Sequence, residues 1–157
     1  MEVIEPGGRN QPRHDLLVEN ARISLKTETG DSTKLDRITI TKLCTTEREP
    51  WEARVLVERV MEHLHRYDVI LMFRAVWNPK AVQYQLVEIP VEALRLISIA
   101  KLEPVGHRRG RQSLGADVTE EGEKIFRVHF DASDGKCSVR SLGIGHCVVL
   151  EAWEVRR

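Results

Sequence analysis

The segment HDLLVENARISLKTE holds three side chains whose types and spacing suit hydrolytic chemistry: Asp15, Ser24 and Lys26. If residues 19–20 form a two-residue turn, residues whose numbers sum to 39 face each other across a hairpin. Asp15 then lies opposite Ser24, and Lys26 is its diagonal neighbour on the same face. A turn shifted by one residue pairs Asp15 with Lys26 instead, and all three still share a face because side chains alternate with period two. The sequence therefore predicts a carboxylate, a hydroxyl and an ammonium group at one hairpin edge, with Glu28 further along that face.

This grouping favours metal-assisted hydrolysis of a phosphodiester. The Asp15 carboxylate suits a hard cation such as Mg²⁺, which stabilises the charge of the transition state and helps to ionise a water molecule. Lys26 would orient or deprotonate that water and offset the developing negative charge. The alternative interpretation of the same spacing is a hairpin with one solvated polar face.

Patterns along the rest of the chain predict the elements that hold this hairpin. Proline and glycine in residues 1–13 argue against a regular element there, and residues 104–115 are expected to form a loop rich in Gly and Arg. Residues 69–77 are almost wholly apolar, which suits a strand covered on both faces. The expected strands span residues 14–18, 21–28, 37–43, 69–77, 82–89, 125–130, 136–142 and 147–155. This order favours an α/β fold, with a mixed β-sheet flanked by helices, over a doubly wound parallel sheet.

Two helices are expected between these strands. Thr46 and Glu49 have capping-box spacing, which predicts the start of a helix that ends near residues 65–67. A second helix is expected over residues 91–101, with Ile99 among the side chains that face inward.

The hairpin and the elements after it resemble the core of the PD-(D/E)xK nuclease superfamily, which includes most type II restriction endonucleases. The stretch ISLKTETG looks like the second-strand motif of that group, and EPWEARVLVERVMEHLHRYDVILMF looks like the helix-strand unit that follows it, as in the mismatch-repair nicking endonuclease. YQLVEIP is similar to a strand-helix junction of restriction enzymes. The resemblance implies one nuclease-like domain over residues 1–157, with an irregular segment 1–13, a restriction-endonuclease-like β-β-β-α-β core in 14–101 and a β-rich C-terminal extension in 102–157.

The resemblance also implies roles for the hairpin residues. Asp15 matches the metal-binding aspartate and Lys26 the catalytic lysine, whereas Ser24 stands where the family has Glu or Asp. That departure removes one metal ligand, for which Glu52 on the first helix is the candidate and Glu28 the alternative. If neither supplies it, the chain is a catalytically degenerate member.

Other residues are candidates for contact with double-stranded DNA. The densest basic patch lies in the loop before residue 113, where Arg would reach phosphate or guanine and Gln adenine. Lys34 and Arg37, beside the hairpin, would hold the DNA backbone. The loop candidates are His107, Arg108, Arg109, Arg111 and Gln112.

Two functions are therefore expected. The first is a Mg²⁺-dependent restriction-type endonuclease that hydrolyses phosphodiester bonds in duplex DNA, as a homodimer or as a monomer. The second is a nuclease-like module that has lost cleavage and binds DNA or a protein. The absence of the family's first helix from residues 1–12 favours the second.

Composition narrows the class of protein. The chain has 24 basic and 24 acidic residues, so binding to nucleic acid by bulk charge is not expected. No signal peptide or membrane-length apolar run is visible. The 3 cysteines include no CxxC pair, which favours free thiols in a reducing cytoplasm, and the resemblance implies a bacterial or phage-encoded protein.

Overall fold

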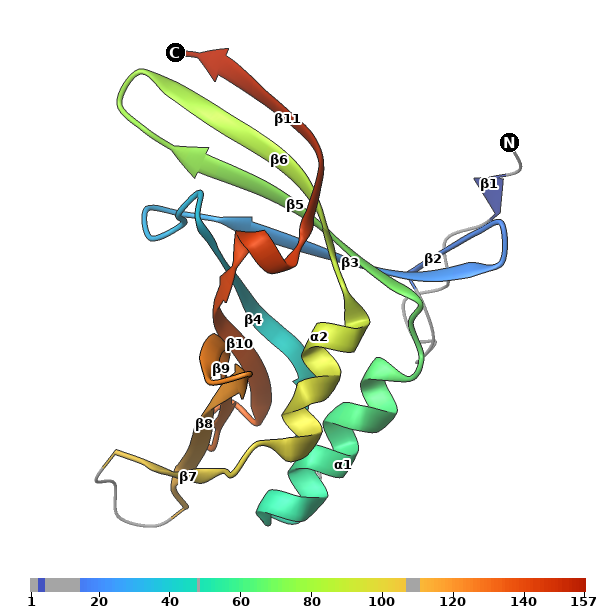
Figure 1. The fold of residues 1–157 in the computed structure, drawn as a ribbon, viewed down its shortest axis with the longest axis vertical. Coiled ribbons are helices and arrows are strands. Elements are labelled where there is room, and N and C mark those ends of the chain that lie inside the picture. The colour runs from blue at the N-terminus through green and yellow to red at the C-terminus, as the bar shows by residue number, and fades with distance from the viewer. Residues whose placement is uncertain (1–2, 5–14, 48, 107–110) are drawn as a thin grey trace.

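Two β-sheets and a small helical layer make up the fold (Figure 1). A computed structural model describes residues 3–4, 15–47, 49–106 and 111–157. Sheet A has six strands and sheet B has five, and Figure 1 shows sheet B and the helices side by side beneath sheet A.

Sheet A combines strands from both ends of the chain. In spatial order it contains β1 (Val3–Ile4), β2 (Leu16–Val18), β3 (Ala21–Thr29), β5 (Val69–Trp77), β6 (Ala81–Ile89) and β11 (Val148–Arg156). The β3–β5 pair is parallel and the other pairs are antiparallel. The sheet is therefore mixed, as the sequence predicts.

Sheet B is wholly antiparallel. It contains β4 (Arg37–Thr45), β10 (Lys136–Gly143), β9 (Glu123–Asp131), β8 (Ser113–Glu120) and β7 (Glu103–Val105). The strand β4 comes from the N-terminal half of the chain, and β11 of sheet A comes from the C-terminal end. The two sheets therefore do not divide at residues 101–102.

The helices lie where the chain passes between the two sheets, and they cover one side of the core. The helix α1 (Ala53–Leu64) lies on the crossover between β3 and β5, and α2 (Val91–Arg95) follows β6 and continues as the 3₁₀ turn η1 (Leu96–Ile99). A second 3₁₀ turn, η2 (Ile144–His146), leads into β11. Both sheets and both helices contribute to one core, including Ile38, Ile40, Leu56, Val60, Leu64, Ile70, Met72, Val87, Ile89, Leu94, Phe126, Val128 and Phe130.

The predicted α/β class and most strands are confirmed, but several local predictions are wrong. Residues 1–13 do contain a short strand, because β1 pairs with the exposed edge of β2. The capping box does not form: α1 begins at Ala53 after Glu52, and the Thr46 hydroxyl has no hydrogen-bond partner among the described residues. Thr46 instead directly follows β4, and its N–H donates to the Gly135 carbonyl oxygen.

The exposure of individual side chains shows that two further predictions are wrong. Only one face of β5 is covered, since Ile70 and Met72 are buried while Phe73 and Trp77 are 41% and 44% exposed. Ile99 is 68% exposed, because the helical turn tightens to 3₁₀ geometry after Arg95 and rotates that side chain outward.

The segment expected to be a loop over 104–115 holds β7 and the start of β8. These strands pair with each other, so their order comes from tertiary contact rather than from a local apolar pattern.

Candidate functional site

The β2–β3 hairpin has the predicted register. Leu16 pairs with Ile23 and Val18 with Ala21, so partner numbers sum to 39. Glu19 and Asn20 have φ values of 46° and 70°, which is the positive-φ pair that a tight two-residue hairpin turn requires. Asp15 therefore lies opposite Ser24, at the open end of the hairpin.

The Asp15 carboxylate is held by two donors from β3. The Leu25 N–H donates to its Oδ2 at 2.8 Å, and the Ser24 hydroxyl donates to the same oxygen at 3.3 Å. The Asp15 N–H donates to the Ile23 carbonyl oxygen at 2.9 Å. Asp15 is exposed and Ser24 is buried, so one carboxylate oxygen is anchored while the group itself faces solvent.

Lys26 follows on the same face of β3. Its Nζ donates to the Lys42 carbonyl oxygen at 3.1 Å. Burial lowers the pKa of Lys26, and the negative charge of Asp15 partly opposes that shift. A hollow of about 280 Å³ adjoins Lys26 between β3 and β4. The three predicted residues are thus brought together, and the amine is partly desolvated.

His63, in the last turn of α1, and Tyr67, just after the helix, lie close to this cluster, and the sequence analysis assigns neither of them a role. Burial lowers the pKa of His63 to about 4, and the positive charge of Lys26 adds to the shift. The His63 ring contacts Tyr67 edge to face at 5.1 Å. Burial and the Asp15 charge raise the pKa of Tyr67, whereas a hydrogen bond with Ser24 opposes them. The i, i+4 spacing of His63 and Tyr67 is the sequence signal that could have paired them.

Glu28 belongs to a different cluster on β3. Its Oε2 accepts a hydrogen bond from the buried Arg74 at 2.6 Å, and its Oε1 accepts the Thr39 N–H at 3.0 Å. Arg74 also donates to the Gln85 side-chain oxygen, to the Lys34 carbonyl oxygen of the β3–β4 connection and to the Arg37 carbonyl oxygen at the start of β4. Both carboxylate oxygens of Glu28 are therefore engaged within the protein.

Glu52 is not brought to the hairpin. It immediately precedes α1, whereas His63, beside Lys26, is at the other end of that helix. Twelve helical residues span about 18 Å. Among the described residues, no group of three His, Cys, Asp or Glu side chains is arranged to hold a metal.

The residues expected to contact DNA lie in two other places. Arg111 stacks on Trp51 at 4.2 Å, and the Trp51 indole N–H donates to the Gln112 carbonyl oxygen at 2.6 Å, so both lie near the start of α1. Lys34 and Arg37 are exposed beyond the far end of β3, where Arg37 pairs with Asp36. His107, Arg108 and Arg109 lie outside the described residues.

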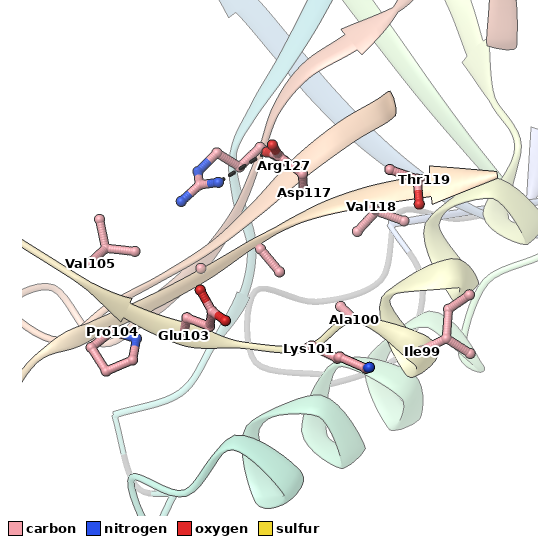
Figure 2. A pocket seen from close by; sticks show the side chains of 12 residues that line it. Ile99, Ala100, Lys101, Glu103, Pro104, Val105, Asp117, Val118, Thr119 and Arg127 are labelled. Atoms are coloured by element: carbon pink, nitrogen blue, oxygen red, sulfur yellow. Dashed lines mark hydrogen bonds and ion pairs between the residues drawn. The ribbon is translucent and has the colours of Figure 1, made fainter. Parts of the chain in front are cut away.

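A larger hollow, of about 470 Å³, lies on sheet B rather than at the hairpin (Figure 2). Lys101 and Glu103 line one side of it, and Asp117 and Arg127 form an ion pair across strands β8 and β9 at 3.0 Å. The larger hollow therefore lies away from the residues that the sequence analysis singles out at the hairpin.

A mixed sheet, a crossover helix and a polar hairpin with a desolvated lysine define a restriction-endonuclease-like α/β protein. Residues 6–155 match the model of the SmaI family, described as type II site-specific deoxyribonuclease, and the chain belongs to that family.

A relative in Serratia marcescens is named type II restriction enzyme SmaI. It is 30% identical over 150 residues, which cover 93% of this chain and 61% of the relative. The chain therefore spans about three-fifths of the length of this curated relative. No solved structure matches the chain. No described helix has the length and apolar character that a membrane crossing requires.

Proposed function

We propose that the chain is a Mg²⁺-dependent DNA endonuclease of restriction type that hydrolyses phosphodiester bonds in duplex DNA. It would be one nuclease-like domain over residues 1–157 with a PD-(D/E)xK core, in which Ser24 replaces the second acid. The observation that carries this proposal is the convergence of Asp15, Ser24 and Lys26 on one face of the hairpin, together with the lowered pKa of Lys26. Membership of a type II deoxyribonuclease family supports the same activity.

The donor set at Asp15 fits a hard cation in part. The residue supplies one carboxylate, and Mg²⁺ is commonly bound by one or two carboxylates, with water and substrate phosphate completing its ligands. Bound there, Mg²⁺ would stabilise the charge that develops on the phosphate. Ser24 would fix the direction of the Asp15 carboxylate, because its hydroxyl donates to Oδ2. Glu28 and Glu52 have no role in this proposal, because the first is engaged by Arg74 and the second lies at the far end of α1.

Lys26 would accept a proton from the attacking water. Partial burial raises the fraction of the amine that is neutral near physiological pH, and the hydrogen bond to the Lys42 carbonyl holds Nζ in place. Once protonated, the ammonium would offset the negative charge of the transition state.

Duplex DNA would contact the protein near both ends of α1. The hairpin lies near its C-terminal end, while Arg111 and Gln112 lie near its start, about 18 Å away. That separation is about half a turn of B-DNA, whose full turn is about 34–36 Å. The sequence loop with His107, Arg108 and Arg109 would extend the second contact, and Lys34 and Arg37 a third. The proposed assembly is a homodimer and the proposed compartment is the bacterial cytoplasm.

Cleavage of supercoiled plasmid and phage DNA tests the proposal. We expect discrete Mg²⁺-dependent nicks or fragments that EDTA abolishes, and a loss of at least about 100-fold in rate for Asp15→Asn and for Lys26→Met. Asp31→Asn and Lys80→Met are matched controls, because both side chains are exposed and lie outside the cluster. Absence of cleavage by the folded protein with Mg²⁺ and with Mn²⁺ would contradict the proposal, and DNA retardation would then identify a binding module.

A further inference from the structure

The face of sheet A that points away from α1 exposes a contiguous aromatic surface. Phe73, Tyr84 and Trp153 stack across three neighbouring strands, with ring centroids 5.4–5.7 Å apart. Strand register places Trp77 and Val155 on the same face, because both flank Val82. We call this surface the aromatic face; it comprises Leu25, Phe73, Trp77, Tyr84, Trp153 and Val155. The Arg157 guanidinium lies over the Trp77 ring at 4.6 Å, and the exposed members of the face remain 41–50% exposed.

The aromatic face continues into a free sheet edge. All nine residues of β11 are exposed, and the strand pairs only with β6 among the described strands. Its apolar residues include Val148, Val149 and Leu150, which are 43–52% exposed. A long, apolar edge strand is a template for pairing with another chain, which folded proteins ordinarily blunt or cover.

The exposed apolar side chains form a substantial part of the area that one partner contributes to a stable interface. Eight side chains of the aromatic face and β11 are each 41–52% exposed: Leu25, Phe73, Trp77, Val148, Val149, Leu150, Trp153 and Val155. With about 150–250 Å² for each large aromatic side chain, Phe73, Trp77 and Trp153 alone expose roughly 200–300 Å². Val149 lies on the other face of β11, because it pairs with the buried Val87. A standard interface buries about 800 Å² per partner, and an apolar patch of this size marks an interaction site.

We propose that a second copy of this chain docks on β11 and the aromatic face, an inference that rests on the homodimer of the proposed function. Two copies of one edge strand pair antiparallel about a two-fold axis, which continues the sheet and sets the two aromatic faces side by side. The charges of β11 suit this arrangement. Glu151 and Glu154 precede Arg156 and Arg157, so antiparallel pairing brings acidic residues of one copy toward basic residues of the other.

The interface lies on the back of sheet A relative to the hairpin cluster. Trp153 pairs with Tyr84 on the aromatic face, whereas Ser24 and Lys26 point toward α1 from the other face. Both proposed cleavage sites therefore stay open in the dimer.

Sedimentation velocity of the full chain, without DNA or metal and from about 1 μM to about 100 μM, tests the inference. We expect a dimer for the wild type and for Ile99→Glu, a matched control at an exposed apolar residue on η1. Trp153→Glu and Val155→Lys should each sediment as monomers, with circular dichroism showing that they remain folded. Dilution of the wild type should also shift tryptophan emission to the red, because Trp77 and Trp153 become solvated.

A wild type that is monomeric over the whole range would overturn the inference and leave the aromatic face to another partner. A dimer that persists in both β11 variants would also overturn it, because the contact would lie elsewhere. The measurement involves no DNA, so a dimer that fails to cleave DNA would contradict the proposed endonuclease activity alone.

Discussion

Two polar clusters share one face of β3 and differ in how completely their groups are paired. Toward the hairpin, Asp15 and Lys26 have few partners, and His63 Nε2 is buried without one among the described residues. Two residues beyond Lys26, Glu28 and Arg74 have partners for both carboxylate oxygens and for all three guanidinium nitrogens. The first cluster is the one that we propose to react, and the second holds β3, β5 and β6 to the β3–β4 connection.

The contrast explains why Glu28 is a poor metal ligand despite its place in the sequence. A carboxylate that neutralises a fully buried guanidinium cannot leave it without exposing an unpaired charge to a low-dielectric interior. Each cluster combines an acidic and a basic side chain. The difference between the two clusters therefore follows from the tertiary contacts that these side chains make.

Removal of the Arg74 side-chain charge should give the largest loss. Arg74→Met leaves Glu28 buried at 10% exposure without its partner, which costs about 3–5 kcal/mol. Urea unfolding followed by circular dichroism measures the free energy of unfolding. The double variant Arg74→Met, Glu28→Gln should recover much of the loss, and an unchanged midpoint in the single variant would show that the pair contributes no stability.

The buried His63 should make the protein sensitive to acid. Its pKa is about 4 when folded and 6.5 when unfolded, so the unfolded chain binds the proton first. Stability should therefore fall as pH drops from 6.5 through 4, by about 3 kcal/mol in total. His63→Leu should flatten this limb of the urea midpoint against pH, whereas the exposed His65→Gln should keep it. Parallel wild-type and His63→Leu curves would contradict the shift.

Loss of the Ser24 hydroxyl should have a smaller effect on stability and a clear effect on cleavage. Ser24→Ala removes one hydrogen bond to Asp15, which costs about 1 kcal/mol. The Leu25 N–H still holds Oδ2, so we expect cleavage to slow by about 10-fold rather than stop. Ser138→Ala, at a buried serine of sheet B, is the control for a simple loss of stability. Equal cleavage rates for Ser24→Ala and the wild type would argue against a role in directing Asp15.

Replacement of Lys26 should show the difference between the two clusters most clearly, because cleavage and stability should respond differently. Burial disfavours the ammonium form, so Lys26→Met should unfold at a urea concentration no lower than the wild type while cleavage is lost. Wild-type stability should rise with pH as Lys26 deprotonates below its unfolded pKa of 10.5, and the variant should lack that rise. A strongly destabilised Lys26→Met would show that the lysine supports the fold.

The hairpin was predictable because its signals are local. Asn20 tolerates the positive φ that the turn requires, and the alternation after it fixes which side chains share a face. The contribution of His63 and Tyr67 was not predictable, since it depends on where the end of α1 packs. The strand β4 follows β3 directly and alternates in the same way, but it leaves for sheet B, because its partner is β10 rather than its neighbour in sequence.

The strand β4 pairs with a strand that is synthesised about a hundred residues later. Cys44 of β4 pairs with Cys137 of β10, and Ala81 of β6 pairs with Arg156 of β11. Each sheet is therefore completed only by the last fifth of the chain, and such non-local pairing slows folding. At about 5–20 residues per second on the ribosome, the nascent chain carries unpaired strand edges for several seconds. The unpaired edges of β4 and β6 should thus need protection by chaperones until β10 and β11 have been synthesised.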